Sequence, residues 1–166
     1  MAELILIRHT EAEEAKTTDR ARNLTKKGKK HALYLANAFK KELVHTDLFV
    51  HSGMNRAEQT LNLILKSKEN LNIMVTETLN HEIEAIEFAK WLKLHAEDLL
   101  KIVVVGHEPH LSRFVGWAVA RSNQTHIQIK KGGVVRLQIT EFSDILKKRM
   151  TLTELISIKQ LKSAGH

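Results

Sequence analysis

The chain has 166 residues, 43% of them hydrophobic, which is enough for one domain with a sizeable core. It contains no cysteine, and this excludes a disulfide scaffold and thiol chemistry. With 26 Lys and Arg against 19 Asp and Glu, the net charge of +7 indicates either a solvated basic surface or an anionic partner.

The first half of the chain alternates short apolar runs with amphipathic stretches. The run from Leu4 to Ile7 predicts a buried strand, and residues 23–43 predict a helix with Thr25 as its N-cap. The apolar stripe of this helix comprises Ala32, Leu35, Ala36, Phe39 and Leu43. A second strand is predicted over residues 47–51, and a helix follows from about Asn55.

The middle of the chain continues this alternation. Residues 72–77 predict a third strand, and residues 82–99 predict a helix. We expect the inner side of that helix to carry Ile83, Ile86, Ala89 and Leu92 or Lys93. Residues 101–107 then predict a strand, because this stretch is apolar, β-branched and bounded by Gly106.

The last third predicts one helix and two strands. Pro109 suits the first turn of a helix whose apolar face comprises Leu111, Phe114, Val115, Ala118 and Val119. Residues 132–140 and 150–158 alternate in the manner of an antiparallel strand pair. Because strands and helices alternate and the strands are apolar on both sides, the fold class is predicted to be α/β, a sandwich with a largely parallel sheet.

The sequence shows no internal repeat, low-complexity tract or linker, so we expect a single domain over residues 1–166. No basic leader precedes the first apolar run, which is too short for a signal peptide or a membrane helix. We therefore expect a cytoplasmic protein without membrane association.

Three of the predicted strands end in basic side chains. Arg8 and His9 follow the first strand, Arg56 lies on the first helical turn after the second, and His107 follows the strand at residues 101–107. Ligands of such sheets bind outside the carboxyl ends of the strands. Arginine forks match phosphate oxygens, helix N-termini add backbone N–H groups, and a histidine can attack phosphorus. Together these residues predict a phosphate pocket.

Each of these residues also has a plainer interpretation. An arginine at a strand end is usually a solvated cap, a lone histidine is more often structural, and Arg56 could pair on the surface with Glu58 or Asp19. The segment GHEPH at residues 106–110 suggests a metal site, but it lacks the i, i+4 histidine spacing of zinc-protease helices. We expect no metal and no cofactor.

Four motifs resemble those of the histidine phosphatase superfamily, in the same order and at the same spacing. They are LILIRHTEAE at residues 4–13, RNLTKKG at 22–28, VHSGMNRAEQT at 50–60 and VVVGHEPHLS at 103–112. The short length and the block RNLTKKGKKHA resemble the SixA-type branch, the phosphohistidine phosphatases. The resemblance implies a three-layer α/β/α sandwich of the phosphoglycerate mutase-like kind, with an antiparallel edge on its mostly parallel sheet.

The resemblance also implies roles for the four basic residues. His9 would be the nucleophile that forms a phosphohistidine, Arg8 and Arg56 would hold the phosphoryl oxygens, and His107 would complete the pocket. The resemblance also places Arg22 and Ser52 near the phosphate, and Thr10, which follows His9, is a further candidate phosphate-binding residue.

The sequence departs from the family pattern at two positions. Thr10 replaces the usual glycine, and its hydroxyl could bond the phosphate or merely be accommodated. Gly53 replaces the usual proline, which we expect to loosen that turn.

The chemistry requires a neutral His9, whose other ring nitrogen we expect to be held by a backbone carbonyl. Neighbouring arginines favour the neutral imidazole and neutralise the phosphoryl group without a metal. A proton donor for the leaving group is harder to identify. Glu82 is the candidate, with Glu84 beside it, although both fit a solvated helix start equally well. The lack of a clear donor suits a phosphoramidate, whose imidazole leaves more readily than an alkoxide.

We therefore expect a metal-independent phosphatase that acts on phosphohistidine in a protein of a phosphorelay or phosphotransfer system and releases inorganic phosphate. The alternative substrates are small phosphomonoesters, such as sugar or nucleotide phosphates. A non-enzymatic phosphate- or nucleic-acid-binding module is a further alternative. It is motivated by the lysines at positions 26, 27, 29, 30, 40 and 41 and the basic run 147–149. Nucleic acid is disfavoured, since only 5% of the residues are aromatic and no base-stacking motif is present.

Overall fold

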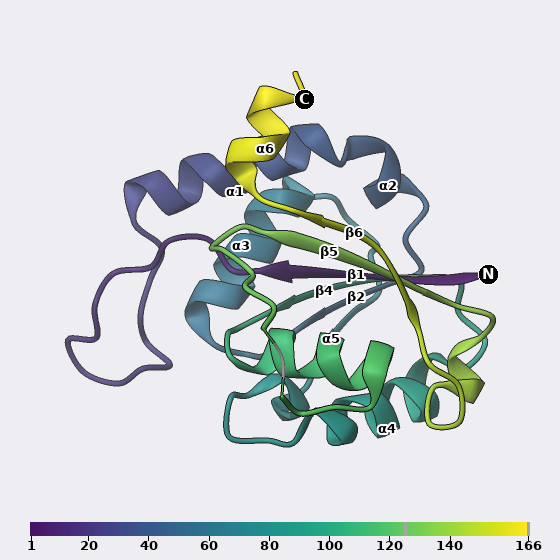
Figure 1. Ribbon diagram of the computed structural model, residues 1–166. Coiled ribbons are helices and arrows are strands. Elements are labelled where there is room, and N and C mark those ends of the chain that lie inside the picture. Colours follow the sequence, from purple (N-terminus) through teal and green to yellow (C-terminus); the bar gives the residue numbers. More distant parts are fainter. Residues whose placement is uncertain (125, 166) are drawn as a thin grey trace.

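A six-stranded sheet with the strand order β3-β2-β4-β1-β5-β6 forms the middle of the molecule (Figure 1). The computed structural model describes residues 1–124 and 126–165. The strands are β1 (Ala2–Arg8), β2 (Leu48–His51), β3 (Ile73–Val75), β4 (Lys101–Gly106), β5 (Val134–Ile139) and β6 (Thr151–Ile156). β3, β2, β4 and β1 pair in parallel, whereas β5 pairs antiparallel with both β1 and β6. The predicted mostly parallel sheet with an antiparallel edge is confirmed.

Helices cover both faces of the sheet, which gives the three predicted layers (Figure 1). One face carries α1 (Lys26–Ala38), α2 (Lys40–Val44), α3 (Asn55–Leu65) and α6 (Ile158–Ser163), and the other carries α4 (Ala85–Ala96) and α5 (His110–Ala120). Two short 3₁₀ helices, η1 (Glu77–Leu79) and η2 (Phe142–Asp144), lie in the connections. No helix in the described part of the chain is long and apolar enough to span a membrane.

The central strands contribute side chains to a hydrophobic core on each face of the sheet. Along β1, Leu4 and Leu6 pack with the α4 and α5 layer, and Ile5 and Ile7 pack with the α1 and α3 layer. Side chains alternate between the two faces of a strand, so a strand covered on both sides is apolar at every position. Burying each such side chain stabilises the fold by roughly 1.5–3 kcal/mol. The apolar run of β1 is thus explained by its two helical layers.

Two predicted helices differ from the observed ones. The predicted helix at 23–43 is interrupted at Phe39, where the backbone leaves the helical region (φ −105°, ψ 20°) and separates α1 from α2. The helix predicted from residue 82 begins at Ala85, so Ile83 and Ile86 are exposed rather than inward-facing. Its buried stripe is instead formed by Ala85, Phe88, Ala89, Leu92 and Ala96.

The predicted last strand is too long at its C-terminal end. β6 ends at Ile156, and Ser157 begins α6 as the N-cap of a capping box with Gln160. The Ser157 hydroxyl accepts the Gln160 N–H, and the Gln160 side chain accepts the Ser157 N–H. The strand therefore gives way to a helix that sequence alternation did not reveal.

The C-terminal ends of the parallel strands lie at one edge of the sheet. Arg8 of β1 is in register with Gly106 of β4, and His51 of β2 is in register with Val105. The β1 arrow in Figure 1 points toward this edge, from which the long loop between β1 and α1 extends. The residues that follow β1, β2 and β4 therefore lie together.

Candidate active site

The backbone after β1 is held on both sides at the sheet edge. The His9 N–H donates to the Gly106 carbonyl (3.0 Å), and the Gly132 N–H lies 3.0 Å from the Arg8 carbonyl and 3.2 Å from that of His9. Gly132 has φ +70°, and a Cβ there would lie 2.3 Å from Cδ1 of Ile158. The positive φ favours glycine here, and the hydrogen bonds of Gly132 hold the backbone of Arg8 and His9 from the side opposite β4.

The His9 imidazole is buried, with 5% of the residue exposed. Its Nδ1 lies 2.7 Å from the carbonyl oxygen of Thr10. Since a carbonyl only accepts, Nδ1 carries the proton and Nε2 carries the lone pair. The Nε–H of Arg56 donates to that lone pair (3.3 Å). The expected backbone-carbonyl partner is thus present, and Nε2 is the nitrogen able to attack phosphorus.

Electrostatics keeps the His9 imidazole neutral. Burial is the largest cause that lowers its pKa from 6.5 to about 4, and the positive charges of Arg56 and Arg8 lower it further. The hydrogen bond to Thr10 opposes these effects. At neutral pH the ring is therefore unprotonated at Nε2.

Arg56 lies on the first turn of α3 and is 4% exposed. Its Nη1 donates to the Asp19 carbonyl (2.8 Å), and its Nη2 lies 3.1 Å from Oδ2 of the Asp19 carboxylate. The other oxygen, Oδ1, accepts from Nη1 of Arg22 (3.1 Å). Partial burial alone would raise the pKa of Asp19, but the two arginines hold it below its ordinary value. Arg56 therefore pairs with Asp19 and contacts His9 at the same time.

His107 follows β4 and is 2% exposed. Its ring centroid lies 5.1 Å from that of His9, and its Nε2 is hydrogen-bonded to Oγ of Ser52. Burial, followed by the neighbouring His9 and Arg56, lowers the pKa of His107 to about 2. Its buried Nδ1 has no hydrogen-bond partner among the described residues.

Arg8 is anchored at one end of its guanidinium. Its Nη1 donates to the Ile129 carbonyl (2.9 Å), whereas its buried Nε has no partner in the described part of the chain. Burial lowers the pKa of Arg8, and the negative charge of Glu108 opposes this effect. An unpaired buried donor costs about 1–3 kcal/mol, and a bound anion would remove that cost. The cluster of Arg8, His9, Arg56 and His107 thus has the chemistry of an oxyanion site.

The Thr10 side chain is directed toward α3. Its hydroxyl lies 3.4 Å from Oγ1 of Thr60, and its N–H donates to the same oxygen (3.2 Å). Thr60 in turn donates to the Arg56 carbonyl (2.7 Å). Thr60 therefore ties the His9 segment to the first turns of α3. A contact between the Thr10 hydroxyl and phosphate stays a prediction.

Gly53 does not merely loosen its turn. It adopts φ +83°, which proline cannot reach, and its N–H donates to Nδ1 of His51 (3.1 Å). Nη1 of Arg20 donates to its carbonyl (3.2 Å). The turn that carries Ser52 is therefore a defined structure built on glycine.

The candidate proton donor Glu82 lies on the surface, before the start of α4. Its carboxylate is 83% exposed and pairs with His81 at 3.7 Å, in a hollow lined also by Glu84 and Arg113. Within the described residues, no hydrogen bond or ion pair joins Glu82 to the cluster. Nor does that part of the chain contain a group of three or more His, Cys, Asp or Glu residues able to hold a metal.

Sequence reasoning missed two residues that organise the site. The sequence suggests Asp19 only as a surface partner of Arg56, and it indicates no role for Thr60, the last residue of the motif RAEQT. Thr60 lies four residues after Arg56, and that spacing places both on one face of α3. This spacing was the available signal for Thr60, whereas nothing in the sequence marks Asp19.

Comparisons with known proteins agree with this fold. Residues 4–100, more than half of the chain, match the family model of the histidine phosphatase superfamily (branch 1). The chain therefore belongs to this superfamily. His107 lies beyond the matched segment. No match was found among curated proteins.

Solved structures of the superfamily share the fold. The protein histidine phosphatase SixA in complex with tungstate has a TM-score of 0.83 and 20% identity, over 96% of this chain and 99% of that one. A protein described as phosphohistidine phosphatase SixA from Nakamurella has a TM-score of 0.79 and 20% identity, over 94% and 95%. A protein described as an α-ribazole-5′-phosphate phosphatase from Escherichia coli has a TM-score of 0.75 and 20% identity, over 95% and 98%. The phosphoglycerate mutase-like three-layer architecture is thereby confirmed.

Proposed function

We propose that this histidine phosphatase removes the phosphoryl group from phosphohistidine in a protein of a phosphorelay or phosphotransfer system, with His9 as the nucleophile. The observation that carries the proposal is the lone pair on Nε2 of His9. The hydrogen bond from Nδ1 to the Thr10 carbonyl leaves this lone pair on Nε2, and Arg56 lies beside it. Arg8 adds a second positive charge, and the neutral ring of His107 completes the surroundings of the phosphoryl group.

In the first step, Nε2 of His9 attacks phosphorus while the P–N bond breaks, and the substrate imidazole, protonated at its other ring nitrogen, leaves as the neutral ring. Arg8 and Arg56 neutralise the charge on the phosphoryl oxygens, and His107 contributes its unpartnered ring nitrogen. In the second step, water attacks phosphorus, the bond to His9 breaks, and inorganic phosphate leaves. The two arginines supply the positive charge, so we infer that no metal takes part.

The acids of the site favour a phosphoramidate substrate. Asp19 contacts the cluster directly, but its lowered pKa keeps it ionised at neutral pH, so it cannot donate a proton. In the described part of the chain, Glu82 pairs with His81, and no hydrogen bond or ion pair joins it to the cluster. An imidazole leaves without a strong acid, whereas the alkoxide of a phosphomonoester needs one. Phosphohistidine therefore fits the site better than a phosphomonoester.

Turnover of the two substrate classes in EDTA tests the proposal. We expect a phosphohistidine protein to be hydrolysed with a higher kcat/KM than α-ribazole 5′-phosphate, a phosphomonoester whose leaving group is an alkoxide. We also expect His9→Ala to abolish both activities. Faster turnover of the phosphomonoester would favour the alternative substrate class. Activity that requires a metal, or that survives His9→Ala, would overturn the mechanism.

A further inference from the structure

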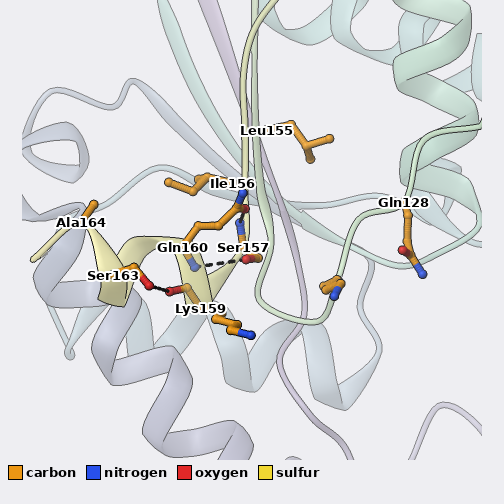
Figure 2. A pocket seen from close by; sticks show the side chains of 9 residues that line it. Gln128, Leu155, Ile156, Ser157, Lys159, Gln160, Ser163 and Ala164 are labelled. Atoms are coloured by element: carbon orange, nitrogen blue, oxygen red, sulfur yellow. Dashed lines mark hydrogen bonds between the residues drawn. The ribbon is translucent and has the colours of Figure 1, made fainter.

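A basic groove lies beside the candidate active site, between the segment 128–130 and the junction of β6 with α6 (Figure 2). Its volume is about 700 Å³. In Figure 2, Gln128 lies on one side, Ser157 and Lys159 lie on the other, and Leu155 of β6 points into the space between them. The groove can therefore hold a segment larger than a phosphoryl group.

The groove shares a wall with the candidate active site. Nη1 of Arg8 donates to the carbonyl of Ile129, which lies between the two groove residues Gln128 and Lys130. Three residues further along this segment, Gly132 donates its N–H to the carbonyl of His9 (3.2 Å). A ligand whose phosphoryl group lies at His9 can thus extend over this short segment into the groove.

The charge of the groove is uniformly positive. Lys130 and Lys159 line it, and an adjoining hollow of about 500 Å³ shares Lys159 and adds Lys27 and Lys162. Among the described residues, neither hollow is lined by an Asp or Glu, and none of these four lysines forms a salt bridge. Their charges are therefore available to a ligand.

One carboxylate lies close to this surface. Glu11 feels the charges of Lys27 and Lys131, but its Oε2 already accepts a hydrogen bond from Thr25 (2.7 Å). Among the described residues that line or adjoin the two hollows, Glu11 faces five lysines, so this surface keeps a large positive excess.

We propose that this groove docks an acidic segment of the substrate protein next to its phosphohistidine. The inference rests on the proposed function, because it takes the substrate to be a protein. Charge complementarity across such a surface raises the encounter rate and suppresses wrong partners. The residues lining the two hollows include no aromatic side chain apart from His31 at the adjoining one, which disfavours the base stacking that single-stranded nucleic acid uses.

Two synthetic phosphohistidine peptides test the proposal, one flanked by Asp and Glu and one flanked by Ser and Gly. Their kcat/KM values are compared in the wild type and in the double variant Lys130→Glu/Lys159→Glu, at low and high salt. The matched control is Lys40→Glu/Lys41→Glu, an equal charge change on exposed lysines of α2, which Figure 1 places to the right of α6 and apart from the groove. Hydrolysis of p-nitrophenyl phosphate reports the chemical step independently.

We expect the wild type to prefer the acidic peptide by about tenfold at low salt and to lose this preference at high salt. The groove variant should lose the preference and retain its p-nitrophenyl phosphate activity, whereas the α2 variant should retain both. Equal turnover of both peptides by the wild type would overturn the docking inference alone. Hydrolysis of neither peptide would overturn the proposed function and the inference with it. Groove-dependent binding of mixed-sequence DNA without a peptide preference would assign the groove to nucleic acid and also overturn it.

Discussion

At the scale of single residues, the site depends on an imidazole that stays neutral beside arginines. Burial and the charges of Arg56 and Arg8 lower the pKa of His9 to about 4, so Nε2 keeps its lone pair throughout the neutral range. Nδ1 holds the proton against the Thr10 carbonyl. The attacking nitrogen is thus prepared by the fold before a substrate binds.

This pKa sets the acid limb of the pH profile. A lowered pKa means that His9 becomes protonated, and so loses its nucleophilic lone pair, only as the pH falls through about 4. We expect kcat/KM for p-nitrophenyl phosphate to be level from about pH 8 down to about pH 5.5 and to fall about tenfold per pH unit below 4. Initial rates in constant-ionic-strength buffers measure this, and a limb centred near 6.5 would contradict it.

Asp19 competes with an incoming phosphoryl group. Its carboxylate bridges Arg56 and Arg22 at 3.1 Å each. A bound phosphoryl group would need the same guanidinium donors. Asp19→Asn keeps the shape of the side chain and removes its charge. We expect the inhibition constant of inorganic phosphate to fall about 3- to 10-fold, since repulsion is relieved. Weaker inhibition by phosphate would instead show that the charge of Asp19 is needed to hold Arg56 in place. Asp144→Asn, at η2, is the control and should leave the constant unchanged.

At the scale of elements, the turn between β2 and α3 positions Ser52 through the conformation of Gly53. With φ +83° and an N–H bonded to His51, this residue occupies a place that proline cannot take. We expect Gly53→Pro, although it restores the family residue, to lower the free energy of unfolding by about 3 kcal/mol. Urea denaturation measures the change. Stability equal to that of the wild type would mean that the turn is as loose as the sequence suggests.

Sequence predicts the elements of this fold where one physical signal dominates. β1 and β4 are predicted because strands covered on both faces must be apolar at every position. α6 was missed because Ile156, Ser157 and Ile158 continue the alternation of β6, and the capping box of Ser157 and Gln160 is the local signal that competes with it. The inner face of α4 is predicted in part: Ala89 and Leu92 are buried, whereas Ile83 precedes the helix and Ile86 lies on its exposed side.

The residues of the site likewise fall into those that sequence predicts and those that it does not. Arg8, His9, Arg56 and His107 are predictable because parallel strands end at one edge of the sheet and each residue directly follows such a strand or begins the next helix. The contact between Asp19 and Arg56 spans 37 residues and depends on how the loop after β1 folds back. No period or spacing in the sequence encodes that path.

At the scale of the whole molecule, the two hydrophobic layers share one sheet. Ile5 and Leu6 are neighbours in β1, yet they belong to different layers. We propose on this basis that residues 1–166 form one domain that unfolds in a single cooperative transition.

The buried histidines make that transition sensitive to acid. The pKa values of His9 and His110 are lowered to about 4 and that of His107 to about 2, each chiefly by burial. Below pH 6.5 the unfolded chain binds more protons than the folded one, so stability is full above 6.5 and is lost as the pH falls toward 4. For His9 alone the loss by pH 4 is about 3 kcal/mol. Urea denaturation at several pH values should show this slope, reduced in His110→Gln and unchanged in a variant of the exposed His45. A stability independent of pH between 4 and 7 would contradict the burial of these rings.

The central claim is that His9 carries the phosphoryl group during turnover, and trapping this intermediate tests it most directly. The protein is mixed briefly with a phosphohistidine substrate labelled on phosphorus, quenched in base and digested, and the labelled peptide is identified by mass spectrometry. The account predicts acid-labile, base-stable phosphate on His9, absent from His9→Ala. Label on another residue, or turnover in which no protein-bound phosphate forms, would contradict it.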